Sequence, residues 1–174
     1  MRLLLLRHAK SDWGDPQLDD IDRPLNARGK AAAITMARYL RDEKLMPSVI
    51  LCSTSQRTRE TLARLLPYLP QEAYIQLISD LYWQSENNYS PLIRKYGGRA
   101  QTLMVLGHNP ATEETAYALT GTSAPDALPD MQEKFPTAAL AVLDFDISDW
   151  SELGTGTGHL ERFVKPRDLK SDDD

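Results

Sequence analysis

Short apolar segments alternate with amphipathic helical segments four times along the first two thirds of this 174-residue chain. The apolar segments cover residues 3–6, 48–52, 74–78 and 102–106. A segment that is apolar at every position, rather than at alternate positions, is typical of a parallel strand covered on both faces. The alternation therefore predicts a three-layer α/β/α sandwich, with a mostly parallel sheet and helices on both faces.

Four helices are predicted between these strands, because apolar residues recur there at the i, i+3, i+4, i+7 spacing of one buried face. The predicted helices cover residues 26–44, a segment around 62–69 that ends at Pro70, residues 86–96, and a segment that begins at Asn109 and ends before Gly121. We expect Asn109 to cap the last of these helices, with Pro110 at its first position.

The last third of the chain departs from this alternation. Residues 122–136 contain three prolines and are predicted to form an irregular connection. Residues 138–145 and 158–164 are predicted as strands with no helix between them, so we expect them to pair antiparallel at an edge of the sheet. Residues 1–166 are predicted as a single domain and residues 167–174 as an acidic tail.

Composition excludes several classes of function. Twenty Lys and Arg stand against 25 Asp and Glu, a net charge of -5, which argues against binding nucleic acid. No apolar run approaches the roughly 20 residues of a membrane span. The single cysteine, Cys52, excludes an intrachain disulfide and favours a reducing compartment, so a cytoplasmic location is expected. The sequence is silent on the oligomeric state, and a monomer is the default expectation. No Asp/Glu cluster has metal-ligand spacing, so neither a metal nor another cofactor is implied.

Polar side chains follow each of the four predicted parallel strands. They are Arg7 and His8 after the first, Ser53, Ser55 and Arg57 after the second, Asp80 after the third, and His108 and Asn109 after the fourth. Sites in open α/β sheets lie beyond the carboxyl ends of the strands, so we expect these groups to converge. Two arginines and two imidazoles suit a compact dianion such as phosphate. The alternative for each residue alone is a structural histidine or a surface ion pair. The third histidine, His159, is predicted at the surface.

Three segments carry a resemblance to a known family: Arg7-His8-Ala9-Lys10-Ser11, the stretch from Ser53 to Thr61, and Gly107-His108-Asn109-Pro110. In this order they resemble the Arg-His-Gly signature, the second arginine motif and the second histidine motif of the histidine phosphatase superfamily. Two further segments are similar to its compact bacterial branch, which contains the SixA-type phosphohistidine phosphatases: Asp22-Arg23-Pro24-Leu25 with Arg28-Gly29, and Asp80-Leu81-Tyr82.

The resemblance implies a role for each matching residue. His8 would be the nucleophile that forms a phosphohistidine intermediate. Arg7, Arg57 and a protonated His108 would hold the phosphoryl oxygens. Ser11 and Asn109 would add phosphate contacts. Two positions depart from the family pattern. Ala9 replaces the signature glycine, and Ser79-Asp80 lies where larger relatives carry a glutamate proton donor, which makes Asp80 the candidate acid or else a turn residue.

The lack of an evident strong acid favours a phosphohistidine substrate. An alkoxide leaving group needs a proton from a general acid, whereas a protonated imidazole leaves as a neutral ring. The expected partner is then a phosphorylated protein, either a histidine phosphotransfer domain or a phosphocarrier. Residues 122–136 are the candidate rim of the site.

Several alternatives stay open at this point. A small phosphoester could be the substrate of a phosphatase or a mutase, and a non-catalytic module could bind a phospholigand while His8 stays idle. A cysteine phosphatase loop fits poorly, because four residues rather than five separate Cys52 from Arg57. The glycine-rich segment 154–158 lacks the Lys-Ser/Thr of a phosphate-binding loop.

Overall fold

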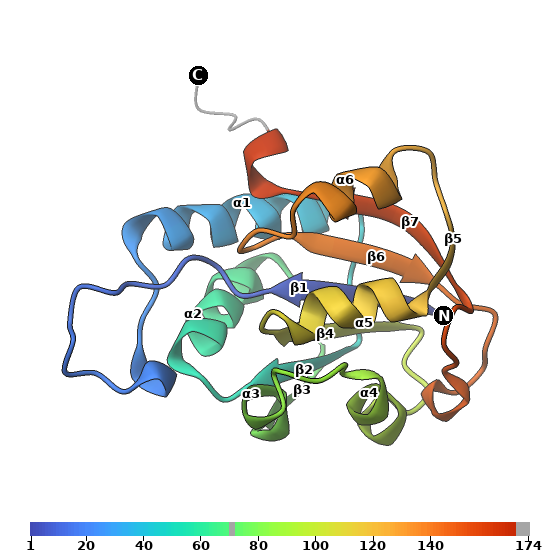
Figure 1. Cartoon of the computed structure of the whole chain (residues 1–174), viewed down its shortest axis with the longest axis horizontal. Helices are drawn as coiled ribbons and strands as arrows, with labels where there is room; N and C mark the ends of the chain where they lie inside the picture. Colours follow the sequence, from blue (N-terminus) through green and yellow to red (C-terminus); the bar gives the residue numbers. More distant parts are fainter. Residues whose placement is uncertain (70–71, 170–174) are drawn as a thin grey trace.

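The computed structural model describes residues 1–69 and 72–169, and it confirms the predicted three-layer α/β/α fold. One mixed sheet has the strand order β3-β2-β4-β1-β6-β7-β5, with helices on both faces (Figure 1). The strands are β1 (Arg2–Arg7), β2 (Val49–Ser53), β3 (Tyr74–Ile78), β4 (Thr102–Gly107), β5 (Thr120–Ser123), β6 (Leu140–Asp144) and β7 (Gly158–Val164). The helices are α1 (Ala27–Asp42), α2 (Gln56–Leu65), α3 (Asp80–Trp83), α4 (Ser90–Tyr96), α5 (Ala111–Leu119) and α6 (Ala127–Glu133).

The central strand β1 connects the two hydrophobic cores. Leu4 and Leu6 point into a core with α1 and α2, whereas Leu3 and Leu5 point into a core with α3, α4, α5 and α6. All four side chains are fully buried. Burying one leucine is worth about 2 kcal/mol, so an uninterrupted apolar run is stable only between two covered faces.

The parallel part of the sheet brings the predicted site residues together. β1 pairs with β4, β4 with β2, and β2 with β3, all in parallel. Arg7 lies opposite Gly107 in the register, so His8 and His108 follow two neighbouring strands at the same edge. Ser53 ends β2 at that edge.

The antiparallel pairing of the two late strands is confirmed, but their expected place at the edge of the sheet is wrong. β6 pairs antiparallel with both β1 and β7. The edge strand on this side of the sheet is β5, which pairs in parallel with β7 and contains Gly121. Its sequence, Thr-Gly-Thr-Ser, has no apolar residue, because the strand is largely exposed and contributes little to the core.

The prediction of an irregular connection over residues 122–136 is wrong as well. This segment holds the end of β5 and the helix α6. Pro129 is tolerated in α6 because it lies in the first turn, where backbone N–H groups have no partner within the helix.

Two helix starts differ from the prediction. The N-cap residue of α5 is Pro110 rather than Asn109, whose side-chain NH₂ instead donates to Glu113 and to the carbonyl of Phe135. The helix predicted from residue 86 begins at Ser90, where Asn88 accepts the backbone N–H. The predicted stop at Pro70 and the end of the acidic tail, residues 170–174, lie outside the described residues.

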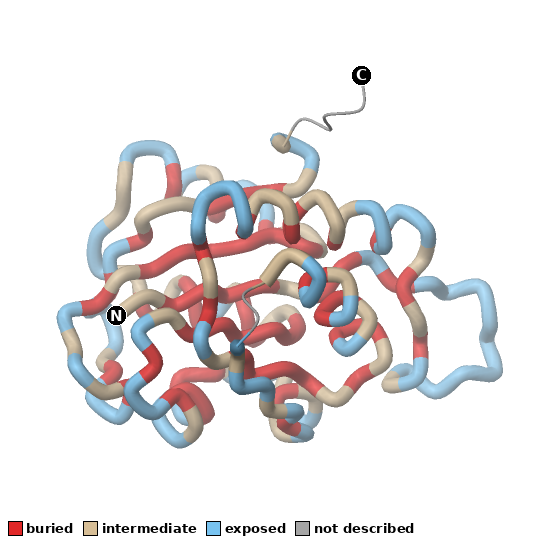
Figure 2. The backbone as a smooth tube through the Cα atoms, turned by 180° about the vertical axis from the view of Figure 1, so that it is seen from behind, coloured by how far each residue is buried: buried red, intermediate tan, exposed pale blue. Residues whose placement is uncertain are grey.

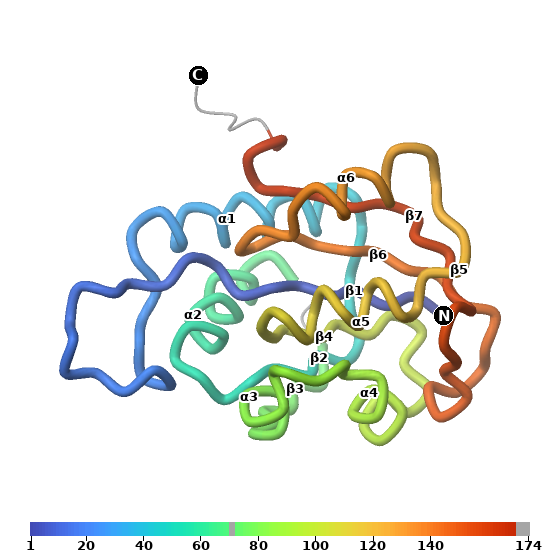
Figure 3. The backbone as a smooth tube through the Cα atoms, in the orientation of Figure 1, coloured from blue at the N-terminus to red at the C-terminus, as the bar shows by residue number. Residues whose placement is uncertain are grey.

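The connection between β1 and α1 is a long loop that reaches beyond the sheet (Figure 3). Residues 12–20 are all exposed, in contrast to the buried strands behind them (Figure 2). An isolated bridge between Ser11 and Leu25 closes the loop at its base. Gly29 lies so close to the Lys10 carbonyl that an added Cβ would approach its oxygen to 2.1 Å. The lack of a side chain at Gly29 therefore allows α1 to pack against the start of the loop.

Candidate active site

His8 is held in one orientation directly after β1. Its ring is buried, and Nδ1 lies 2.7 Å from the carbonyl oxygen of Ala9. A carbonyl only accepts hydrogen bonds, so Nδ1 carries the proton and Nε2 keeps its lone pair. Burial and the neighbouring His108 lower the pKa of His8 well below its usual value. The imidazole is therefore neutral and has a free basic nitrogen.

His108 lies beside His8, with the two ring centroids 5.1 Å apart. Its Nε2 is 2.7 Å from the hydroxyl oxygen of Ser53, which also accepts the backbone N–H of Ser55. Burial and the nearby Arg57 lower the pKa of His108 to about 3. The expected protonated state of His108 is therefore wrong for the free protein. Among the described residues, no hydrogen-bond partner reaches its buried Nδ1.

Two arginines complete a cationic cluster around His8. Arg7 donates through one NH₂ group to the Phe135 carbonyl, and its buried Nε has no partner among the described residues. Arg57 lies in the first turn of α2 and is buried. Both of its terminal nitrogens donate to Asp20, one to the backbone carbonyl at 2.7 Å and one to the carboxylate at 3.0 Å.

A pocket of about 370 Å³ opens over this cluster. Its lining includes Arg7, His8, Ser11 and Arg57, four of the residues that the sequence predicts. The other lining residues come from two segments: Lys10, Trp13, Asp20 and Arg23 from the long loop, and Lys134, Pro136 and Thr137 from the chain before β6. Of the expected rim, residues 122–136, Lys134 and Pro136 line the pocket.

Asp20 is the centre of a network that the sequence prediction did not include. Its carboxylate accepts from Arg57, from Arg23 at 3.0 Å and from the Tyr82 hydroxyl at 2.9 Å. Burial alone would raise the pKa of Asp20, but the hydrogen bonds from Tyr82 and Arg57 outweigh it and lower that pKa. The motif Asp22-Arg23-Pro24-Leu25 could have pointed to Arg23, whereas Asp20 has no signal in a single sequence.

The remaining predicted residues lie at the margin of the cluster. The Ser11 hydroxyl accepts a hydrogen bond from Arg23, which also lies beneath the Trp13 ring at 3.0 Å from its centroid. Asn109 packs under the site, and its side-chain oxygen is buried without a partner among the described residues. Asp80 begins α3, does not line the pocket and has no hydrogen bond to either histidine. His159 is exposed, as expected.

Cys52 has no access to this pocket. It is fully buried in the core with α1 and α2, and burial raises the pKa of its thiol to about 12. A thiol nucleophile must ionise to attack phosphorus, so the cysteine phosphatase alternative is excluded.

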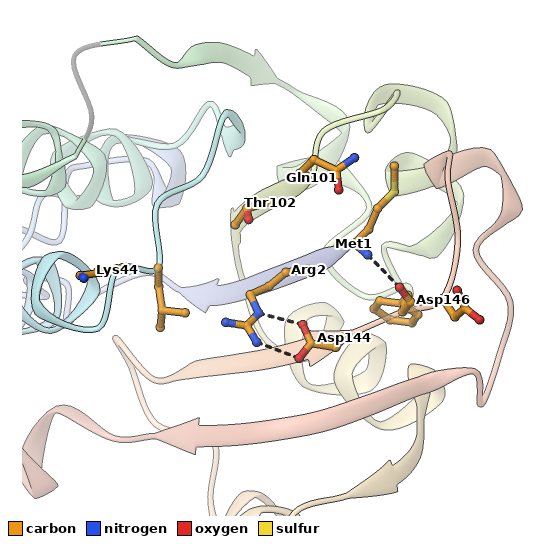
Figure 4. A pocket seen from close by; sticks show the side chains of 9 residues that line it. Met1, Arg2, Lys44, Gln101, Thr102, Asp144 and Asp146 are labelled. Atoms are coloured by element: carbon orange, nitrogen blue, oxygen red, sulfur yellow. Dashed lines mark hydrogen bonds and ion pairs between the residues drawn. The ribbon is translucent and has the colours of Figure 1, made fainter.

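A second cavity, of about 600 Å³, lies at the opposite, amino-terminal ends of β1 and β4 (Figure 4). Arg2 lines it, but its guanidinium forms two hydrogen bonds with Asp144, and the N-terminal amine donates to the Phe145 carbonyl. Arg2 and Asp144 are thus paired with each other and the terminal amine with the backbone, whereas Arg7 Nε and His108 Nδ1 have no hydrogen-bond partner among the described residues.

Two other features concern the described residues as a whole. No group of three or more His, Cys, Asp or Glu side chains among them could hold a metal ion. None of the helices within residues 1–69 and 72–169 is long and apolar enough to cross a membrane.

The fold and the site define an α/β protein with a cationic pocket beside a buried histidine. The family model of the histidine phosphatase superfamily (branch 1) matches residues 3–80. An uncharacterized chloroplastic protein of Arabidopsis thaliana is 35% identical over 95% of this chain and 78% of its own length. An uncharacterized protein of Mycobacterium tuberculosis is 34% identical over 93% of this chain and 100% of its own length.

Solved structures agree with this assignment. SixA from Agrobacterium tumefaciens is 33% identical, covers 95% of this chain and 97% of its own, and superposes with a TM-score of 0.79. A SixA structure complexed with tungstate is 21% identical and superposes with a TM-score of 0.71, which shows the same fold. The chain belongs to the histidine phosphatase superfamily, and it is an enzyme of the phosphatase class.

Ser53→Ala is expected to reduce kcat/KM about fivefold to tenfold. The substitution removes one neutral hydrogen bond, worth about 1 kcal/mol, and with it the contact that fixes which ring nitrogen of His108 carries the proton. Ser55→Ala is the matched control. Ser55 caps α2, so its loss should lower the melting temperature while activity stays near wild type. Wild-type kinetics in Ser53→Ala would contradict a role for Ser53 in positioning His108.

Folding stability is expected to decrease as the pH falls below about 6.5. The unfolded chain binds protons on both His8 and His108 near that pH, whereas the folded chain does not, because burial lowers the pKa of both groups. The loss is up to about 1.4 kcal/mol per pH unit for each histidine. Urea unfolding at pH 7 and pH 5 measures it. His108→Gln should lose less stability between these pH values than wild type; equal losses would argue against a neutral buried His108.

Proposed function

We propose that this enzyme is a phosphohistidine phosphatase that works through a covalent phosphohistidine on His8. Nε2 of His8 attacks phosphorus, the P–N bond of the substrate breaks, and the substrate imidazole, already protonated on its other ring nitrogen, leaves as a neutral ring. Water then cleaves the phosphoryl group from His8 and regenerates the free nitrogen. The orientation of His8 supports this, since Nδ1 donates to Ala9 and leaves Nε2 as the nucleophile.

The surrounding cations support the same reaction. Arg7, Arg57 and the Nδ1–H of His108 would hold the phosphoryl oxygens, and charge-assisted hydrogen bonds from arginine suit a dianion. Ser53 would donate to Nε2 of His108, which keeps the Nδ1 proton available for the substrate. Ser11 and Asn109 would act indirectly, through Arg23 and Phe135.

The choice of substrate depends on one observation. Among the described residues that line the pocket, Asp20 is the one carboxylate, and its hydrogen bonds to Tyr82 and Arg57 keep it ionised. Asp80, the candidate acid, does not line the pocket and has no hydrogen bond to either histidine. A site without a protonated carboxylic acid suits a phosphoramidate, whose leaving nitrogen needs less help than an alkoxide. The 33% identity to SixA of Agrobacterium tumefaciens supports the same branch of the superfamily.

The test is phosphate release from a protein phosphorylated on histidine, compared with release from a panel of phosphomonoesters. The proposal expects kcat/KM for the phosphohistidine protein to exceed that for each phosphomonoester by several orders of magnitude. Preference for a phosphomonoester would assign the site to a small-molecule phosphatase. Phosphate binding without turnover of any substrate would favour a non-catalytic module.

Asp20→Asn is expected to tighten the binding of inorganic phosphate severalfold. The Asp20 carboxylate occupies the same guanidinium that would hold the substrate anion, so the two negative charges compete for Arg57. The inhibition constant of phosphate measures the effect. Asp22→Asn makes the same charge change at an exposed neighbouring position and should leave this constant unchanged. Weaker phosphate binding in Asp20→Asn would show that Asp20 supports the anion site rather than competing with it.

A further inference from the structure

A groove continues from the phosphoryl pocket toward the carboxyl end of the chain. It has a volume of about 470 Å³ and lies between α1, residues 134–137 and the short 3₁₀ helix Pro166–Asp168. Lys10, Lys134, Pro136 and Thr137 line both the groove and the pocket. A molecule that places its phosphoryl group on His8 therefore also reaches the groove.

The groove is basic, although the chain as a whole has a net charge of -5. Lys10, Arg28, Lys134 and Arg167 line it, and none of the described lining residues carries a carboxylate. Arg167 is paired with Glu133 at 3.4 Å and with Asp168 at 3.6 Å, both outside the lining. Lys10, Arg28 and Lys134 form no ion pair with any described residue. Cations gathered in this way repel one another unless an anionic partner lies between them.

The other lining residues point to a protein as the occupant. Ala31, Ala32 and Pro136 provide an apolar surface beside the charged groups, the arrangement of an interface with an apolar centre and a polar rim. Trp13, which lines the phosphoryl pocket, is 76% exposed, and Trp83, which packs against Tyr82, is 72% exposed. Exposed tryptophans are common anchors of protein interfaces. A small phosphoester would need neither the groove nor these rings.

We propose that this basic groove binds acidic side chains that surround the phosphohistidine of a substrate protein. The inference rests on the proposed function, because it takes a phosphoprotein as the substrate. Arg28 and Arg167 are the residues that test it, since they line the groove but not the phosphoryl pocket.

Arg28→Glu is expected to raise the KM for an acidic histidine-phosphorylated protein roughly tenfold, with kcat unchanged and kcat/KM for phosphoramidate unchanged. Arg167→Glu should act in the same direction. Lys30→Glu is the matched control, because Lys30 is exposed on the same helix and lines neither cavity. The difference in KM between the Arg28→Glu and Lys30→Glu variants should shrink at roughly 0.5 M salt, because the Debye length there falls well below about 10 Å.

Each other outcome overturns the inference in a different way. Equal KM values for the Arg28 and Lys30 variants, with wild type active on the phosphoprotein, would reject the groove and keep the proposed function. A loss confined to phosphoserine, a small phosphoester with a second anionic group, would assign the groove to a small substrate. A wild type that is inactive on the phosphoprotein but active on phosphomonoesters would reject both proposals.

Discussion

His8→Ala is expected to abolish phosphate release, with a loss of roughly four orders of magnitude or more. The proposed reaction passes through a covalent bond to Nε2 of His8, which is the one imidazole among the described residues that line the pocket. Wild type incubated with a ³²P-labelled phosphohistidine protein should become labelled with an acid-labile phosphate, whereas the variant should not.

The control for this prediction is His159→Ala. His159 is exposed and bonded only to Thr122, so its loss should change neither turnover nor labelling. A folded His8→Ala protein with the same melting behaviour as wild type and undiminished turnover would remove His8 from the mechanism.

Arg57→Ala is expected to lower kcat/KM by roughly two to four orders of magnitude, because the guanidinium would stabilise charge on the transferring phosphoryl group in a buried setting. Arg57→Lys keeps the charge but loses the paired donors, so its activity should lie between those of wild type and Arg57→Ala. Steady-state kinetics with the phosphohistidine protein measure both variants.

Arg59→Ala is the matched control. Arg59 lies two residues after Arg57 in α2, and among the described residues its side chain donates a hydrogen bond only to the Gln56 side chain. Because Arg57 also holds Asp20, the melting temperature of each variant separates a loosened loop from a lost catalytic contact. Equal activity of the Arg57 and Arg59 variants would contradict the assigned role.

The fold was predictable from the sequence where the pattern of apolar residues reflects which faces of a strand or helix are buried. The four leucines of β1 face two cores, so they produce an unbroken apolar run that indicates a covered parallel strand. β5 gave no such pattern, because an exposed edge strand can be built from Thr, Gly and Ser. α6 was hidden by Pro129, which one sequence cannot distinguish from a proline in a loop.

The site was predictable in the same measure. His8 and His108 directly follow β1 and β4, Arg7 ends β1 and Arg57 lies in the first turn of α2, so the predicted strand ends brought these residues to one end of the sheet. The sequence also suggested a protonated His108, which the structure contradicts, because the charge state depends on burial. Asp80 was chosen by its position after β3. That position begins α3, whose Tyr82 reaches the cluster, whereas Asp80 itself does not line the pocket.

The order of strands and helices along the sequence, together with the residues at the strand ends, predicted the class of fold, the end of the sheet that holds the candidate site and the cationic character of that site. These features are local, since each depends on a few neighbouring residues. Tertiary structure alone decided which ring nitrogen of His8 is free and that Ser53 reaches His108. It also decided that the Asp20 carboxylate pairs with Arg57, which lies 37 residues further along the chain. Such contacts join segments that are distant in sequence, and their geometry is set by the packing of the loop and helices around the sheet.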